Sequence, residues 1–172
     1  LAQLLTLRPE SAERIAQRAD MDPVELGNRL LEMSGKGLIF RIRKDDSLRY
    51  MAAQFVVGIW EYHVNDLDPD LIKDMNEYVP YLFDESNRPP PPQLRTIPLS
   101  RALPVEQTVM PYDEARSLVL THQTIAVAPC ICRKEHRMAG DGCDKPMESC
   151  LVFGTGAQYY EENGIGRSIS RE

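Results

Sequence analysis

The chain has 172 residues, of which 42% are hydrophobic and 27% charged, a balance that excludes a disordered or collagen-like chain and indicates a globular protein. No run of eighteen apolar residues occurs, and the N-terminal residues lack the basic start and cleavage site of a signal peptide. We therefore expect a cytoplasmic protein with no membrane span. The net charge of −6 equals the charge of residues 65–85 alone, and such a charge run is typical of a solvated helix face.

Residues 1–64 predict two helices followed by a β-hairpin. Ser11 is placed to cap the first helix, and Asp22, with a proline after it, is placed to cap the second. Alternating apolar and polar residues over 38–43 predict a strand, and "KDDS" supplies turn residues before the next strand. This order resembles a winged-helix domain, with the hairpin as its wing.

A winged helix raises the question of DNA binding, which requires clustered cations to neutralise phosphates. The second helix offers Glu25, Arg29 and Glu32, and its two carboxylates repel a phosphate backbone. The wing carries four basic residues, namely Arg41, Arg43, Lys44 and Arg49. We interpret the domain as a packing or homodimerisation module and regard DNA as an unlikely partner.

The middle of the chain changes character twice. Residues 54–86 continue as helix with a break near Asp68, and their 65–86 part is the acidic helical segment. Residues 87–111 hold seven of the thirteen prolines, which predicts an extended arm or linker. Residues 112–172 then predict a helix and a short apolar strand, "TIAVAP", that leads into the cysteines.

All four cysteines lie in one short window with the spacing C-x-C-x10-C-x6-C, at Cys130, Cys132, Cys143 and Cys150. Intracellular thiols are usually not disulfides, and a C-x-C pair is too close to bridge itself without strain. A shared metal explains all four cysteines together. Gly142, just before the third cysteine, leaves a backbone N–H that can donate to sulfur.

The spacing leaves two metals open. A structural zinc site usually takes two C-x2-4-C knuckles, and only a tighter half of that pattern is present. An iron–sulfur cluster also takes four thiolates, but the common C-x2-C-x2-C-x3-C-P run is absent. A nucleophilic cysteine is disfavoured, because that chemistry gives no reason for four thiols in one cluster.

The stretches "IAVAPCICR", "GDGCDKPMESCLVFG" and "AQYYEENGIGRSISRE" resemble a family of iron–sulfur proteins of anaerobes, the 4Fe-4S ferredoxins, in which a winged-helix start precedes a C-x-C-R…G-C-D-x-P-x-x-x-C-L-x-F-G module. The resemblance is strong over residues 125–172 and implies that the four cysteines bind one [4Fe-4S] cluster. It makes Arg133 a nearby cation that favours the reduced state of the cluster. Family members continue into further ferredoxin-type cysteine runs, so we expect this chain to be a fragment of a longer protein.

Together these observations predict an α+β, mainly helical protein: a winged helix over 1–64, the acidic segment, the proline-rich arm, and a four-cysteine module over 112–172. The predicted function is electron transfer or redox sensing by one [4Fe-4S] cluster, with an unidentified redox partner protein. No general acid–base pair, phosphate-binding loop or nucleophile constellation indicates independent enzyme activity. The alternative is a zinc-stabilised winged-helix module for interaction or DNA binding.

Overall fold

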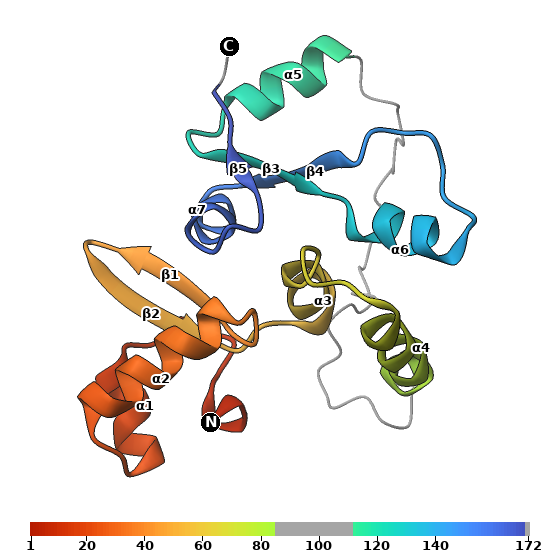
Figure 1. Cartoon of the computed structure of the whole chain (residues 1–172). Helices are drawn as coiled ribbons and strands as arrows, with labels where there is room; N and C mark the ends of the chain where they lie inside the picture. Colours follow the sequence, from red (N-terminus) through yellow and green to blue (C-terminus); the bar gives the residue numbers. More distant parts are fainter. Residues whose placement is uncertain (85–111, 171–172) are drawn as a thin grey trace, which may run out of the picture. The chain divides into compact units, whose positions relative to one another are not determined.

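The computed structural model of this chain describes residues 1–84 and 112–170. These residues fall into two compact units, and residues 1–67 together with 120–170 form the larger one. Helices and two small antiparallel sheets make up the fold (Figure 1), which confirms the expected α+β class. Within the described ranges, no helix combines the length and the apolar character needed to cross a membrane.

The first two helices begin at the side chains that the sequence marks as caps. α1 (Ala12–Ala19) follows Ser11, whose hydroxyl accepts a hydrogen bond from the N–H of Arg14. α2 (Pro23–Gly35) follows Asp22, whose carboxylate accepts from two backbone N–H groups at 2.9 Å. These acceptors satisfy amides that have no partner inside a helix. The two helices share a core with the hairpin, formed by Ile15, Ala16, Leu26, Leu30, Ile39 and Tyr50.

The predicted hairpin is present as β1 (Phe40–Lys44) paired antiparallel with β2 (Ser47–Met51). Its turn residues Asp45 and Asp46 have φ of 50° and 60°. Two consecutive positive φ angles are the mark of the two-residue hairpin turn whose twist matches that of the strands, and aspartate tolerates this conformation.

The segment after the hairpin differs from the predicted continuous helix. Phe55–Ile59 is irregular, because Val56 and Val57 have extended backbone torsions and Gly58 has φ of 166°. α3 is confined to Trp60–Tyr62. Two β-branched residues followed by glycine have low helix propensity, and this local preference outweighs the apolar periodicity that suggested a helix.

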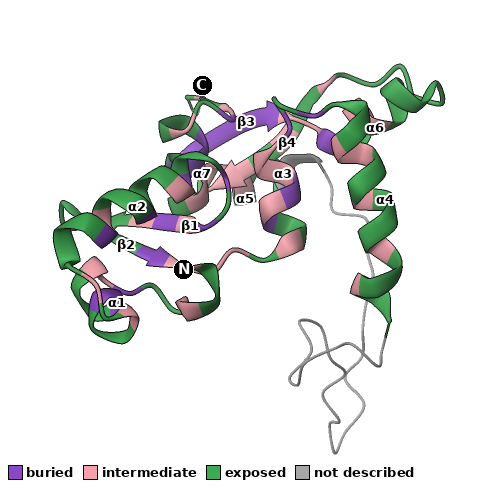
Figure 2. Ribbon diagram, turned by 60° about the horizontal axis from the view of Figure 1, so that its bottom comes forward, coloured by how far each residue is buried: buried purple, intermediate pink, exposed green. Residues whose placement is uncertain are grey.

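The second sheet has the strand order β4-β3-β5, with β3 (Ile125–Pro129) in the centre between β4 (Glu148–Phe153) and β5 (Arg167–Ser168). β3 is the expected apolar strand, and four of its five residues are buried (Figure 2). α7 (Thr155–Glu162) packs against this sheet and also against β1.

Tyr159 of α7 packs the C-terminal part of the chain against the N-terminal part. Its side chain is 1% exposed, and its hydroxyl donates to the carbonyl of Ser34 at 2.7 Å, with the carbonyl of Ile39 at 3.2 Å. Its ring lies 4.9 Å from that of Phe40 and 4.8 Å from that of Tyr62, centroid to centroid. Residues 1–67 and the C-terminal segment therefore share one interior.

Arg41 of β1 makes a second connection. Its side chain is 8% exposed and donates to the hydroxyl of Ser34 at 2.9 Å, to Asn163 at 3.0 Å and to Glu162 at 3.0 Å. Arg43, on the same face of the strand, pairs with the other carboxylate oxygen of Glu162 at 3.0 Å. Two of the four basic residues expected on the hairpin are thus bound to the end of α7.

The smaller unit contains α4 (Pro69–Phe83) and nearly all of α5 (Tyr112–Leu120). α4 lies in the acidic segment, and the predicted break is present, since Asp68 caps the helix through the N–H of Leu71 at 2.8 Å. The predicted proline-rich arm over 87–111 lies outside the described residues.

Candidate metal centre

Three of the four cysteines lie where β3 ends. In the β3–β4 pairing, Ala128 is opposite Cys150, and the register shifts directly after that pair. Cys130 follows β3, and its N–H donates to the carbonyl of Met147 at 2.8 Å. The buried strand β3 thereby places Cys130 and Cys150 on neighbouring segments of the fold, although they are twenty residues apart in the sequence.

Cys130 and Cys132 lie at the start of a helix. α6 (Ile131–Ala139) begins directly after Cys130, its N-cap residue, and Cys132 is in the first turn. Backbone N–H groups in the first turn of a helix lack acceptors within the helix, and the helix dipole places partial positive charge there. The start of α6 therefore offers backbone donors to sulfur.

Burial and neighbouring negative charge act on two of the thiols. Burial raises the pKa of the Cys132 thiol, and the charges of Cys130 and Glu61 raise it further. Burial likewise raises the pKa of Cys150, again with contributions from Cys130 and Glu61. Cys130 thus contributes to the raised pKa of both other thiols. We call Cys130, Cys132 and Cys150 the three-thiol group.

Cys143 is exposed in the loop 140–147 that connects α6 to β4. Gly140 ends α6 with φ of 87°, and Gly142 packs closely on the helix, since a Cβ there would lie 2.7 Å from the Cα of Arg137. The observed role of Gly142 is steric, because the missing Cβ lets the loop pack closely on α6. Its expected role as a donor to sulfur stays a prediction.

Arg133, expected as a cation beside the metal, is bound to this loop. Its Nη1 donates to the carbonyl of Pro146 and to the hydroxyl of Ser149. These contacts hold the residues just before Cys150 against the first turn of α6. The observed contacts of Arg133 are thus structural.

The four cysteines have the chemistry of a metal-binding set, but within the described residues the structure does not arrange them as one. All four cysteines are free thiols, and four thiolates are a complete ligand set for either a [4Fe-4S] cluster or a structural zinc ion. In the part of the chain that the structure describes, no group of three or more His, Cys, Asp or Glu side chains is arranged to hold a metal ion. Comparison with protein-family models, curated proteins and solved structures gives no match.

Two neighbours of the three-thiol group were not found by sequence reasoning. Glu61 of α3 contributes negative charge at Cys132 and Cys150. Lys134 of α6 donates from Nζ to the carbonyl of Val64 at 2.6 Å. The charge of Glu61 and the hydrogen bond of Lys134 both depend on a contact between segments some seventy residues apart in the sequence. A local sequence pattern does not predict such a contact.

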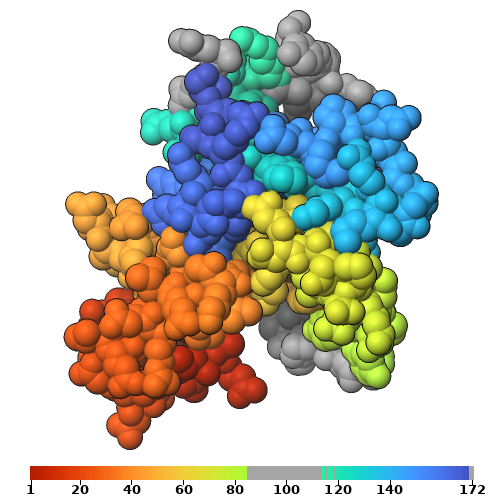
Figure 3. Space-filling view, viewed as in Figure 1, coloured from red at the N-terminus to blue at the C-terminus, as the bar shows by residue number. Residues whose placement is uncertain are grey.

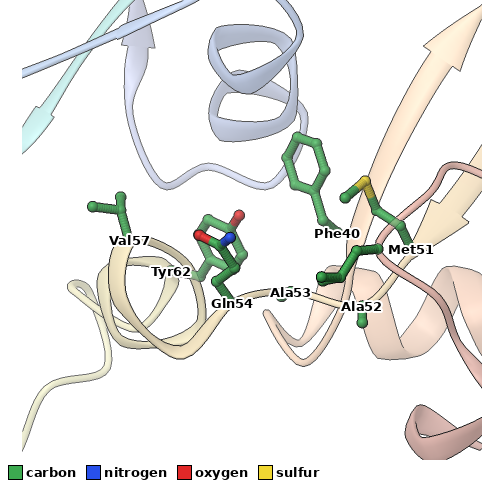
Figure 4. Close-up of a pocket in the computed structure, with 8 residues that line it drawn as sticks. Phe40, Met51, Ala52, Ala53, Gln54, Val57 and Tyr62 are labelled. Atoms are coloured by element: carbon green, nitrogen blue, oxygen red, sulfur yellow. The ribbon is translucent and has the colours of Figure 1, made fainter. Parts of the chain in front are cut away.

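A pocket of about 290 Å³ lies between the hairpin and the irregular segment Phe55–Ile59 (Figure 4). Phe40, Met51, Val57 and Tyr62 supply its apolar lining, and Gln54 supplies a side-chain amide. None of the four cysteines lines it.

Proposed function

We propose that the chain binds one [4Fe-4S] cluster through Cys130, Cys132, Cys143 and Cys150 and serves in electron transfer or redox sensing. The observation that carries the proposal is the three-thiol group at the end of β3, because chain segments twenty residues apart converge there. The resemblance of residues 125–172 to 4Fe-4S ferredoxins favours this cofactor over zinc. When bound, the cluster would supply one-electron redox chemistry.

Each element around the thiols has a definite part in this proposal. β3 fixes Cys130 and Cys150, and the first turn of α6 presents Cys132 together with backbone donors. Cys143 would complete the set from the loop 140–147, whose ends are held by Gly142 and Arg133. Because metal ligation requires thiolates, the raised pKa values of Cys132 and Cys150 mean that loading releases protons and weakens as pH falls.

We also propose that residues 1–58 form a winged helix used for packing. Two helices and a hairpin support this assignment, as does the bridge in which Glu10 and Tyr50 exchange backbone hydrogen bonds of 3.0 and 2.8 Å. DNA binding gains no support, because Arg41 and Arg43 of the hairpin are bound to Glu162. Only cations left in solvent can neutralise phosphates effectively.

The test is anaerobic purification followed by iron, zinc and acid-labile sulfide analysis with a visible spectrum. We expect about four iron and four sulfide per chain with a brown colour. Cys143→Ala and Cys150→Ala should lose both the iron and the sulfide. Lys145→Ala, at an exposed position of the same loop that the module pattern leaves variable, should bind the cluster like the parent protein. One zinc per chain without sulfide would refute the cluster and leave a zinc-stabilised module.

A further inference from the structure

The outward side of α2 carries apolar side chains that lie in solvent. Leu26, Leu30 and Ser34 are on the inward side of the helix and are buried. On the outward side, Val24 is 72% exposed and Leu31 is 43% exposed. Figure 3 shows the α2 region, in orange, at the surface. Single exposed apolar residues are ordinary, so the meaning of this face depends on the residues around them.

The exposed positions of α2 recur at the spacing of a helix–helix seam. Val24, Asn28, Leu31 and Gly35 follow one another at intervals of four, three and four residues, and all are exposed. Such intervals are typical of the a and d positions at which two helices pack side by side. Gly35 has no side chain, and the nearest atom to a Cβ there would be the side-chain oxygen of Asn163 at 4.0 Å. The outward side of α2 therefore has the pattern and the room for a further helix.

Charged residues run along one edge of this seam in alternating order. They are Glu25, Arg29, Glu32 and Lys36, which pair within the helix at 2.6 Å as Glu25–Arg29 and Glu32–Lys36. All four side chains are more than half exposed, so these pairs contribute little to the stability of the single chain. From the N-terminal end the signs are negative, positive, negative, positive, and from the C-terminal end they are the reverse. Two antiparallel copies of α2 therefore place opposite charges side by side.

We propose that α2 pairs with α2 of a second copy of the chain, antiparallel about a two-fold axis that passes beside Leu31. This inference names a partner for the proposed packing role of residues 1–58, on which it rests, and does not depend on the cluster. Leu31 meets the partner's Leu31 next to the axis, and Val24 packs near the end of the partner helix, where Gly35 leaves room. Each contact away from the axis occurs twice, because a two-fold interface uses the same patch on both copies.

The charges decide both the direction of the helices and the occupant. With the axis between positions 30 and 31, Glu25 lies opposite the partner's Lys36, and Arg29 lies opposite the partner's Glu32. An antiparallel two-fold pair brings the same edge of both helices together, whereas a parallel pair would turn the charged edge of each helix toward the uncharged edge of the other. The alternating signs also leave the edge without net charge, which disfavours nucleic acid as the occupant.

Two single variants test the pairing through these charges. Arg29→Glu gives a chain with glutamate at both central positions of the edge, and Glu32→Arg gives a chain with arginine at both. Each variant alone should dimerise less than the parent protein, because two attractive contacts become repulsive. A mixture of the two variants restores both contacts and should form a heterodimer. The measurement is sedimentation velocity over a range of protein concentrations, with one of the two chains carrying a fluorescent label at its N-terminus.

Leu31→Glu tests the apolar centre of the interface. It places two carboxylates beside the axis and should raise the dissociation constant of the dimer about tenfold or more. Leu7→Glu adds the same charge at a side chain that is 65% exposed and lies outside α2, so this control should associate like the parent protein. Circular dichroism and the unfolding curve of each variant verify that it is folded.

We expect a monomer–dimer equilibrium for the parent protein. A parent protein that stays monomeric at about 1 mM overturns the inference, while the contacts of residues 1–58 with α7 remain. A dimer that Leu31→Glu does not weaken overturns it as well, because the interface would then lie elsewhere. A mixture of Arg29→Glu and Glu32→Arg chains that is no more dimeric than either variant alone overturns the antiparallel arrangement. Iron and sulfide contents do not enter this test, so its result is separate from that for the proposed cluster.

Discussion

Replacement of Arg41 by methionine should destabilise the larger unit substantially. The guanidinium is 8% exposed and hydrogen bonds to three side chains at 2.9–3.0 Å, of which Glu162 is 30% exposed. A hydrogen bond to a charged group contributes about 1.5–3 kcal/mol. Removal of the guanidinium also recovers its own desolvation cost, and Glu162 keeps Arg43, so we expect a net loss of roughly 2–3 kcal/mol. This is a large part of the free energy of unfolding of a typical domain, about 5–15 kcal/mol.

The assay is urea unfolding followed by fluorescence of Trp60, the single tryptophan, which is 5% exposed. Arg43→Met is the matched control, because that side chain is half exposed and pairs with the same carboxylate, and its effect should be clearly smaller. In a double-mutant cycle with Glu162→Gln, the loss for the pair should be smaller than the sum of the single losses. Equal effects of Arg41→Met and Arg43→Met would refute the view that burial gives the Arg41 contacts their strength.

Three further predictions follow from the same packing. Tyr159→Phe removes the donor to two buried carbonyls and should cost about 1–3 kcal/mol in the urea assay; no loss would mean that water replaces the hydroxyl. Burial alone would raise the pKa of Glu162, but hydrogen bonds from two arginines hold it below 4.5. The ionised Glu162 therefore stabilises the fold above its pKa in the unfolded chain, and this stabilisation is lost as pH falls through its pKa in the folded chain. Glu162→Gln should flatten the acid limb of the curve of unfolding free energy against pH. An unchanged curve would contradict the pairing of Glu162 with the two arginines. Gly142→Ala places a Cβ 2.7 Å from the Cα of Arg137 and should displace the loop and lower the iron content, whereas Gly27→Ala, with its nearest neighbour at 3.6 Å, should leave that content unchanged.

Local signals predicted much of the fold, because each depends on a few adjacent residues. The caps at Ser11 and Asp22, the break near Asp68 and the turn at Asp45 and Asp46 are confirmed. In each case a side-chain oxygen or a tolerated positive φ satisfies a backbone requirement within four residues. The irregular Phe55–Ile59 segment was predicted wrongly, because its apolar spacing is compatible with a helix while its valines and glycine disfavour one.

The cysteines of the candidate centre could be located from the sequence, and their surroundings could not. Arg41 and Arg43 looked like wing cations, but Glu162, some 120 residues away in sequence, binds both. Glu61 likewise lies about seventy residues before the cysteines and near Cys132 only in the folded chain. The spacing of residues in the sequence shows which residues are close along the chain. The charges that act on a site depend on tertiary packing, which the spacing does not show. The cluster itself stays a prediction.

The contacts of Tyr159 have a consequence for folding during synthesis on the ribosome. The Tyr159 ring packs against Phe40 and Tyr62, and Tyr159 is made 120 positions after Ile39, whose carbonyl lies beside its hydroxyl. At a synthesis rate of 5–20 residues per second, that separation corresponds to roughly ten seconds of elongation. During that interval Phe40 and Tyr62 lack the aromatic contact that Tyr159 makes with them in the folded chain.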